Sequence, residues 1–368
     1  MQTRPANEFA LLDGARGLAA LAVVFYHRGP FPAFPGVVNA GISFGYVGVS
    51  VFFVISGFVI WQSALRRAGG GPRGALEFLK RRALRIYPAY WAGLVLCLAV
   101  SLFVLSPAND RIPIAIPHWN LEYPPYTPAD LLSTATLTYC IPPFSFHTPN
   151  VVYWTLAVEQ QFYLLVGLLI LPVFRRVRVP LLLASTAFAA AHELGWFGVR
   201  TISFYLLPRH WMEFVLGILL FMIVQRSAPR WATVPLFLAL VAGGLAPTWA
   251  AGNQNGPRSL AAAGFALLLL AIYPLDGRLA KAWWLAPVRY LGRISYSLYL
   301  IHFAGFALHD WLMAAVLPRG SFLAYAGGIA AALLLASGFW WLFERPFLSR
   351  QRRARARPVP TPAIGAVA

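Results

Sequence analysis

The sequence holds little charge and few of the groups that bind metals or form disulfides. Of its 368 residues 11% are charged, Asp and Glu together number 12, and there are two cysteines. Two cysteines do not make a disulfide framework, and no HExxH or CxxC pattern offers ligands to a metal ion. A phosphate-binding loop of the GxxxxGK type is also absent. We therefore expect neither a metal ion nor a permanently bound cofactor.

Apolar residues dominate what is present. They make up 59% of the chain, a share that a soluble protein of this length does not carry, which indicates a membrane protein with several spans. Ten apolar stretches have the length of a membrane-crossing helix. They lie near residues 9–28, 44–65, 86–105, 156–174, 179–197, 211–225, 231–250, 259–275, 294–316 and 322–343. The expected fold is therefore an all-α bundle of about ten transmembrane helices.

The positive charge is distributed in a way that indicates how this bundle is oriented. With the N-terminus in the cytoplasm, 24 of the 30 Lys and Arg residues fall on the cytoplasmic side and six on the outer side. This asymmetry follows the positive-inside rule, so the net charge of +18 reflects membrane topology and not nucleic-acid binding. We expect both termini in the cytoplasm, a membrane domain over 9–347 and a basic, disordered tail over 348–368.

The first apolar stretch carries an ionisable residue near each end, Arg16 and His27. A separation of eleven residues is about three helical turns, so both side chains lie on one face, roughly 16 Å apart along the axis. Ionisable side chains within a span normally face the bundle interior or a water-filled cavity. The pair therefore predicts a polar path through about half of the hydrocarbon layer. In the alternative reading, Arg16 extends to lipid headgroups and His27 marks the outer interface.

The fourth apolar stretch contains a carboxylate at a depth similar to that of His27. Glu159 lies about one turn inside the outer boundary, and Gln160, Gln161 and Tyr163 follow it. A carboxylate beside an imidazole fixes its tautomer and stabilises the imidazolium, as a general base requires. We therefore predict that Glu159 orients His27. The alternative is a purely structural pairing of Glu159 with an arginine.

Two arginines before the third stretch, Arg82 and Arg85, share a helix face because they are three residues apart. Paired guanidinium groups at a membrane surface suit phosphate, whose oxygens they bind bidentately. Ordinary positive-inside charge is the alternative, and we prefer it for Lys80 and Arg81. In the second stretch, Ser56 lies among glycines that permit close helix packing, and its hydroxyl can also bind a ligand.

The other histidines and the long outer loop give weaker signals. His302 lies among several hydroxyl side chains in the ninth stretch, where we expect a buried histidine with satisfied hydrogen bonds. Residues 128–139, within a loop over about 106–155, are predicted to form a helix at the outer interface. Trp119 in this loop can stack on a sugar, although interfacial anchoring is the commoner role. The histidines expected in loops or at interfaces, without a paired group, are His118, His147, His192, His210 and His309.

Six segments together resemble acyltransferase family 3, whose members are integral-membrane O-acyltransferases that modify cell-envelope polysaccharides and some small molecules. They are LDGARGLAALAVVFYH, SVFFVISGFVI, RRALRIYPAYW, YWTLAVEQQFYLL, RISYSLYLIHF and FERPF, in order from residue 11 to about 347. The resemblance implies that Arg16 and His27 are essential and that Glu159 is the carboxylate of the family pattern. It also links Arg82 and Arg85 to the use of acyl-CoA.

The resemblance implies a function as well. An acyl group, expected to be acetyl, passes from cytoplasmic acyl-CoA to a hydroxyl of a cell-envelope polysaccharide, lipopolysaccharide or related glycan, in a bacterial inner membrane. The residues that we expect to act are His27, Glu159 and Arg16 in catalysis; Arg82, Arg85, Arg16 and Ser56 in donor binding; and Trp154, Tyr163 and Trp119 in acceptor binding. The sequence ends about twenty residues after the last predicted span, so we expect the stand-alone form without an SGNH domain.

Two alternatives stay open. The acceptor can be a small molecule such as a macrolide, because no residue separates a sugar hydroxyl on a polymer from one on a natural product. A secondary transporter or flippase for a glycan precursor also has many spans and charges within the membrane. A transporter, however, needs neither a phosphate clamp nor a His–Glu pair, and the two halves of the sequence show no inverted symmetry.

Overall fold

The computed structural model describes residues 10–104, 125–141, 148–174, 176–193, 207–226, 230–245, 256–318 and 320–348. All regular secondary structure within these ranges is helical, so the expected all-α fold is confirmed. The α-helices are α1 (Ala10–Arg28), α2 (Gly36–Ser43), α3 (Gly48–Leu65), α4 (Gly71–Phe103), α5 (Pro128–Ala135), α6 (Trp154–Leu169), α7 (Arg178–Glu193), α8 (Trp211–Val224), α9 (Arg230–Leu245), α10 (Gly256–Ile272), α11 (Asp276–Leu279), α12 (Ala286–Met313) and α13 (Phe322–Phe339).

Each predicted apolar stretch overlaps one helix: α1, α3, α4, α6, α7, α8, α9, α10, α12 or α13. Within the described parts of the chain, five helical stretches are long and apolar enough to cross a membrane. They are Gly36–Leu65, Ala68–Phe103, Leu207–Val224, Gly256–Leu279 and Phe322–Leu348. The chain is therefore a multi-pass membrane protein. Helices α1, α6 and α12, which carry several of the ionisable residues described below, are not among the five.

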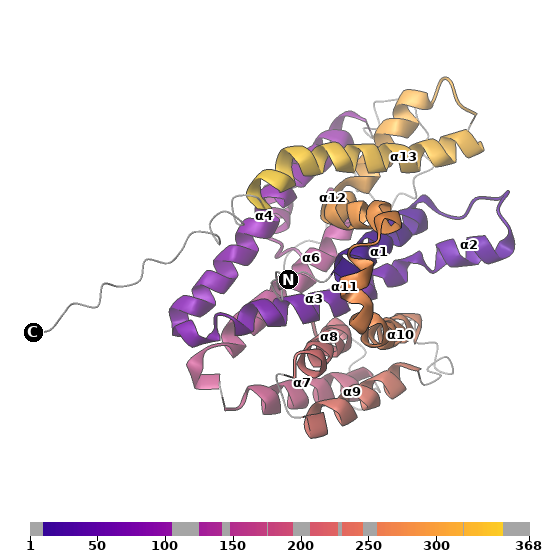
Figure 1. The fold of residues 1–368 in the computed structure, drawn as a ribbon. Helices are drawn as coiled ribbons and strands as arrows, with labels where there is room; N and C mark the ends of the chain where they lie inside the picture. The colour runs from indigo at the N-terminus through magenta and orange to yellow at the C-terminus, as the bar shows by residue number, and fades with distance from the viewer. Residues whose placement is uncertain are drawn as a thin grey trace, which may run out of the picture.

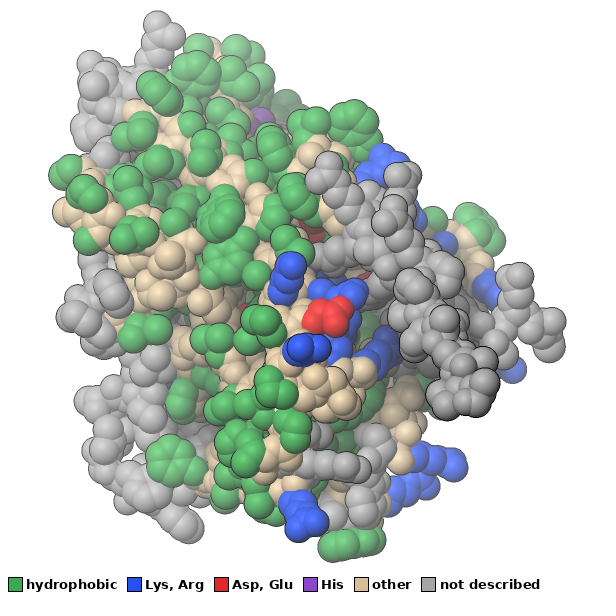
Figure 2. Space-filling model, turned by 90° about the vertical axis from the view of Figure 1, so that its left-hand side faces the viewer, with side chains coloured by type: hydrophobic (Ala, Val, Ile, Leu, Met, Phe, Trp, Pro, Cys, Tyr) green, Lys and Arg blue, Asp and Glu red, His purple; other side chains and the backbone are tan. Residues whose placement is uncertain are grey.

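Large apolar side chains cover much of the outside of the bundle. Val95, Phe103 and Leu334 are 67%, 77% and 73% exposed. Figure 2 shows apolar side chains spread widely over the described part of one face, with Lys and Arg gathered around acidic atoms in one area. Soluble proteins rarely expose such an extensive apolar surface, whereas lipid tails cover it readily. This surface is typical of a bundle that faces lipid.

The helices pack in an order that differs from their order in the chain. Helix α12 packs against both α13 and α1, α1 packs on α3, and α3 packs on α8 (Figure 1). Helices α4 and α6 pack on each other and against this row, through α12 and α3 respectively. The middle of the bundle thus combines the two ends of the described chain. Where α3 crosses α8, a side chain on Gly57 or Gly217 would overlap the backbone of the other helix, so small residues permit the contact.

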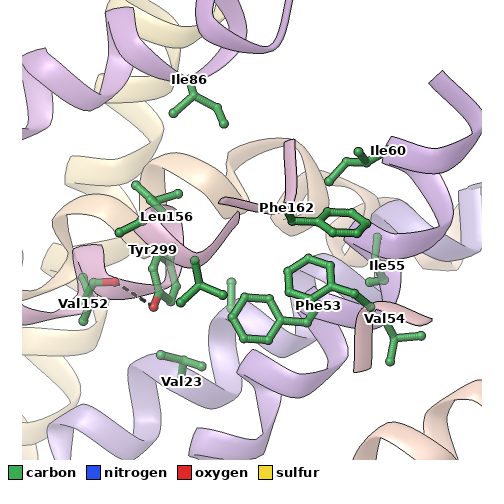
Figure 3. Packing of buried hydrophobic residues seen from close by; sticks show 14 of the residues in the cluster. Val23, Phe53, Val54, Ile55, Ile60, Ile86, Val152, Leu156, Phe162 and Tyr299 are labelled. Carbon is green, nitrogen blue, oxygen red and sulfur yellow. Dashed lines mark hydrogen bonds between the residues drawn. The ribbon is translucent and has the colours of Figure 1, made fainter. Parts of the chain in front are cut away.

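An aromatic core holds α3, α6 and α8 together. Phe53, Phe162 and Phe214 are each at most 3% exposed. The ring centroids of Phe53 and Phe162 lie 4.7 and 4.2 Å from that of Phe214. Figure 3 shows Phe53 and Phe162 in this cluster, together with Tyr299 of α12, whose hydroxyl donates to the Val152 carbonyl at 3.0 Å. The core therefore forms a rigid wall beside the polar residues of the site.

The segment between α4 and α6 packs along α4. Residues 128–135 form the helix α5, which ends four residues before the end of the predicted helix. The hydroxyls of Tyr126 and Ser101 are 2.9 Å apart near the end of α4, whereas the Thr134 carbonyl accepts a bond from the Tyr90 hydroxyl at 2.6 Å. Ser101 and Tyr90 are about 16 Å apart along α4. The predicted helix is therefore confirmed over Pro128–Ala135, and it runs beside α4.

Side chains of α4 make this position possible by binding the last carbonyl groups of α5. The Tyr90 hydroxyl donates to Thr134, and the Trp91 indole nitrogen donates to the Ala135 carbonyl at 2.9 Å. The final carbonyl groups of a helix have no partner within the helix, and in apolar surroundings an unbound carbonyl is costly. Donors on α4 thus replace the water that an interfacial helix would use.

Replacing Tyr90 with Phe removes the hydroxyl that binds the Thr134 carbonyl, which keeps its hydrogen bond from the Leu137 N–H at 2.9 Å. We expect the free energy of unfolding to fall by about 1 kcal/mol, the net value of one hydrogen bond. Thermal unfolding of the purified protein in nanodiscs measures the change. Tyr290→Phe is the control, because Tyr290 is 41% exposed. If Tyr90→Phe unfolds like the unchanged protein, this bond does not hold α5.

Candidate active site

The crossing of α1 with α12 determines what surrounds the two ends of α1. Gly17 and Gly292 meet so closely here that a side chain on either would overlap the backbone of the other helix. Close approach of this kind is how helices in lipid gain contact energy. Because no side chain separates the two backbones, Arg16 and His27 of α1 lie close to α12 and the helices around it.

Three arginines gather near the N-terminal half of α1. Arg16 and Arg82 both lie within electrostatic range of Arg85 and Glu159. Arg82 is only 9% exposed, and its guanidinium carbon lies 5.7 Å from the ring centre of Tyr163. The structure therefore brings together five of the residues that the sequence nominates for the site, although they come from three different helices.

Two carboxylates accompany these arginines, and a serine binds each. Glu159 accepts a hydrogen bond from Ser56 Oγ at 2.7 Å, and Glu344 accepts one from Ser297 Oγ at 2.6 Å. Glu344 is 7% exposed and lies within electrostatic range of two of the arginines. Ser56, nominated as a donor-binding residue, thus contacts Glu159. Glu344 is a site residue that the sequence analysis missed.

The local backbone explains why Glu344 was missed. Glu344 ends a π-helical turn, Trp340–Glu344, directly after α13. A wide turn of this kind departs from the 3.6-residue period, so the periodicity of the last apolar stretch does not indicate which face Glu344 takes. Such turns are frequent at functional sites. The signal in the sequence is the acidic residue of FERPF immediately after an apolar stretch.

The cluster combines three guanidinium groups with the carboxylates of Glu159 and Glu344. Asp13 is a third carboxylate, 3.9 Å from Arg16, but its side chain is 58% exposed and water screens its charge. Arg82 is buried, whereas Arg85 is exposed and therefore open to a ligand. Guanidinium groups bind phosphate with particular strength, so the cluster is suited to a phosphate-bearing ligand.

The other end of α1 brings His27 beside a second histidine. His27 Nδ1 lies 2.9 Å from His302 Nε2, and the two rings meet edge to edge, with centroids 5.0 Å apart and an interplanar angle of 15°. His302 is fully buried, and its Nδ1 lies 3.0 Å from the carbonyl oxygen of Tyr299. The burial expected for His302 is confirmed. Its contact with His27 was not predicted.

The predicted orientation of His27 by Glu159 is therefore corrected. The described contacts give His27 a histidine partner, and they give Glu159 a serine and two arginines. The alternative reading, in which Glu159 accompanies arginine, fits these contacts. The reason for the error is physical: a position within an apolar stretch indicates depth only approximately, and packing decides which helices are neighbours. Glu159 lies within electrostatic range of Arg16, towards the other end of α1, and the neighbour of His27 is α12.

Arg28, directly after His27, anchors this end of α1 to the neighbouring helices. Its two Nη atoms donate to both carboxylate oxygens of Asp310 at 2.7 and 2.9 Å, and Nη2 also donates to the Ala324 carbonyl at 2.7 Å. Bidentate contacts of this type are among the strongest and most directional in proteins. His309 Nδ1 lies 2.9 Å from Asp310, so the expectation that His309 has no paired group is wrong. Together these bonds tie α1 to α12 and α13.

A second polar cluster joins α3, α8 and α10. His210 Nδ1 lies 3.9 Å from Glu213 Oε1, which corrects the expectation that His210 has no paired group. Ser50 Oγ lies 3.5 Å from the same carboxylate oxygen. Arg258 lies over the ring of Tyr46 at 5.7 Å and within electrostatic range of Glu213. The signal was present in the sequence, because His and Glu three residues apart share a helix face.

Aromatic rings connect this second cluster to His27. The ring of Trp154, nominated for acceptor binding, has its centroid 5.2 Å from that of His210. Tyr46 packs on Tyr26, the residue before His27, with centroids 5.4 Å apart. A few polar groups between aromatic and apolar walls are typical of ligand sites. These contacts place a second group of polar and aromatic residues near His27, separate from the arginine cluster.

Four residues named in the sequence analysis have no described side chain. Trp119, His118 and His147 lie outside the described residues, and the side chain of His192 is not described. Within the described ranges, no group of three or more His, Cys, Asp and Glu side chains could hold a metal ion.

Known proteins resemble this chain over most of its length. A family model described as an acyltransferase domain, acyltransferase family 3, matches residues 9–341. The putative membrane-bound transacylase BcsY of Komagataeibacter xylinus is 29% identical, over 95% of this chain and 86% of BcsY. The exopolysaccharide production protein ExoZ of Rhizobium meliloti is 29% identical, over 88% of this chain and 95% of ExoZ. The O-acetyltransferase OatA of Staphylococcus aureus is 24% identical over 79% of this chain, a match that spans 49% of OatA. No solved structure matches the chain.

Replacing Asp310 with Asn removes the charge that binds Arg28. We expect the free energy of unfolding to fall by about 3 kcal/mol, because the guanidinium group stays in place without its anionic partner. Thermal unfolding in nanodiscs measures the change. The matched control is Glu77→Gln: the side chains of Glu77 and Arg81 are 51% and 33% exposed, so losing this pair should cost at most about 1 kcal/mol. Equal losses in the two variants would contradict a specific clamp at Arg28.

Proposed function

The chain belongs to acyltransferase family 3, and on that premise we propose that it transfers an acyl group from cytoplasmic acyl-CoA to a hydroxyl of a cell-envelope glycan. One observation carries the proposal: α1 joins a cluster of three arginines, which suits phosphate, to a pair of histidines, which can supply a base. These two centres are separated by roughly 16 Å along α1. The transporter alternative is set aside, because the family is one of acyltransferases.

The proposed orientation follows from the distribution of Lys and Arg. All ten helices that overlap the predicted spans cross the membrane, both termini lie in the cytoplasm, and the membrane is the inner membrane of a bacterium. On this orientation Arg82 and Arg85 lie on the cytoplasmic side, where acyl-CoA is found. Arg258 lies towards the outer side. The similarity to BcsY, whose name describes a membrane-bound transacylase, supports a membrane location for the reaction.

The donor binds through its phosphates at the arginine cluster. Arg16, Arg82 and Arg85 supply the guanidinium groups, and the guanidinium group of Arg82 packs against the ring of Tyr163. Glu159, itself bound by Ser56, keeps the arginines in position. This is the role we propose for Glu159 in place of the predicted contact with His27.

The uncharged pantetheine arm extends along α1 and brings the thioester to His27. The phosphates stay at the arginines, because charge is costly within the bilayer. His27 takes the proton of the acceptor hydroxyl, the hydroxyl oxygen attacks the thioester carbonyl carbon, and the carbon–sulfur bond breaks. The released thiolate receives a proton and leaves as CoA. Transient acylation of His27 is the variant of this mechanism that the sequence analysis left open.

The acceptor binds on the other side of His27, at the cluster of His210, Glu213 and Arg258 with the rings of Trp154 and Tyr46. Polar groups between aromatic rings suit a sugar. The name of ExoZ refers to exopolysaccharide production and that of OatA to O-acetyl transfer, which supports a glycan acceptor and an acetyl group for this chain. A macrolide-like small molecule is the alternative acceptor.

Protein in nanodiscs, supplied with acetyl-CoA and a bacterial envelope extract, should release CoA thiol and acetylate a polymer of the extract. His27→Ala should lower kcat by at least about 100-fold, because the general base is lost. Binding of radiolabelled acetyl-CoA should stay unchanged in this variant. If the unchanged protein releases no CoA with any of several acyl donors, the proposed reaction is wrong. Label on a small molecule and not on polymer would favour the alternative acceptor.

A truncated donor isolates the role of the arginines. Arg82→Ala and Arg85→Ala should each raise KM for acetyl-CoA by about 10- to 100-fold, since a charge-assisted hydrogen bond is worth about 1.5–3 kcal/mol. Neither variant should change kcat/KM for acetyl-pantetheine, which has no nucleotide phosphates. Arg81→Ala is the control, because Arg81 pairs with Glu77 at the exposed surface. An equal loss with both donors would show that these arginines do not bind the nucleotide.

A further inference from the structure

The contacts of His302 determine which of its nitrogens carries the proton. Nδ1 lies 3.1 Å from the carbonyl oxygen of Leu298 and 3.0 Å from that of Tyr299. Carbonyl oxygens only accept hydrogen bonds, so Nδ1 is a donor. His302 is fully buried, and a buried imidazole without a partner anion is neutral. The lone pair of His302 is therefore on Nε2.

The same reasoning then applies to His27. Nε2 of His302 lies 2.9 Å from Nδ1 of His27 and accepts a hydrogen bond from it. Nδ1 of His27 is therefore protonated, and a neutral His27 has its lone pair on Nε2. Two backbone carbonyl groups of α12 thus select, through His302, the tautomer of a side chain on α1.

Aromatic side chains keep both imidazole rings in this arrangement. The Phe303 centroid lies 4.7 Å from that of His27 and 4.4 Å from that of His302. Phe306 lies 5.8 Å from His302, and both phenylalanines are at most 1% exposed. A ring flip of His302 would require these close-packed neighbours to move. With the ring positions exchanged, carbon atoms would face the Tyr299 carbonyl and His27 Nδ1, and both hydrogen bonds would be lost.

We propose that His302 is a positioning residue, which keeps the proton of His27 on Nδ1 so that Nε2 is the basic atom. This inference rests on the proposed function, in which His27 is the general base. The O–H bond of the acceptor breaks, its proton moves to His27 Nε2, the O–C bond forms, and the C–S bond of the thioester breaks. Nε2 then gives its proton to the CoA thiolate. Throughout, Nδ1–H donates to His302, which stabilises the imidazolium.

A neutral partner suits a base that works inside a bilayer. A carboxylate at the position of His302 would carry a charge in the resting state, when His27 is neutral and the nearby Arg28 is already bound to Asp310. Intramembrane charge of this kind is costly. A second imidazole orients His27 through the same acceptor geometry and adds no charge.

Two substitutions test whether His302 acts as a hydrogen-bond acceptor or only fills space. The amide oxygen that His302→Gln introduces can accept the hydrogen bond from His27 Nδ1, whereas His302→Leu offers no acceptor. We expect His302→Leu to lower kcat by about 10- to 100-fold with an unchanged KM for acetyl-CoA, since loss of a partner that orients a functional histidine typically has an effect of this size. His302→Gln should keep kcat within about threefold of the unchanged protein.

A spectroscopic measurement tests the tautomer without relying on activity. The full-length protein in nanodiscs is labelled with ¹⁵N-histidine, and the spectrum of His27→Ala identifies the His27 signals among those of the seven histidines. We expect a protonated Nδ1 and an unprotonated Nε2 in the unchanged protein and in His302→Gln. In His302→Leu, the Nε2-protonated form should gain population.

The outcomes distinguish a failure of this inference from a failure of the proposed function. If the unchanged protein consumes acetyl-CoA and His27→Ala does not, but His302→Leu has normal kcat, then His302 does not position the base. An Nε2-protonated His27 in the unchanged protein, or equal loss of kcat in His302→Leu and His302→Gln with an unchanged tautomer, would overturn it as well. If no variant consumes any acyl donor, the proposed function fails, and the tautomer is decided by the spectrum alone.

Discussion

Where Gly17 of α1 meets Gly292 of α12, two backbones touch with no side chain between them. Apolar side chains gain little by leaving lipid for a helix interface, so such contacts and hydrogen bonds are what hold helices together in a bilayer. Arg28 and Asp310 fix the same two helices at the far end of α1. These two contacts together determine the register of α1 relative to α12. The histidine contact and the surroundings of Arg16 both follow from that register.

Polar residues of the site lie both on helices that are apolar enough to cross a membrane and on helices that are not. Helices α1, α6 and α12 are not among the stretches that are apolar enough by length and composition alone, whereas α4, α10 and α13 belong to such stretches. Buried charge is costly unless other groups bind it. Ser56 and Ser297 do so at the carboxylates, and the arginines accompany these carboxylates in turn. The site helices are thus stabilised by one another and by the apolar helices packed around them.

The helices and the site were predictable to different degrees. Apolar length is a local property, so every predicted stretch overlaps a helix. The shared face of Arg82 and Arg85 is local too, and the structure brings both to Arg16. The partner of His27 depends on which helix packs beside α1, and no residue spacing contains that information. The course of α5 along α4 depends on donors such as Tyr90 and Trp91, which in the sequence look like ordinary aromatic residues of a span.

The position of Glu344 depends on the number of residues in the π-helical turn after α13. Trp341 and Leu342 within it are 59% and 56% exposed, so other apolar side chains can take their places facing lipid. Loss of one residue from the turn would restore a regular α-helix and rotate Glu344 by about 100°. The carboxylate would then leave Ser297, and the arginine cluster would lose one of its buried anions. This helix end therefore tolerates substitution far better than deletion or insertion.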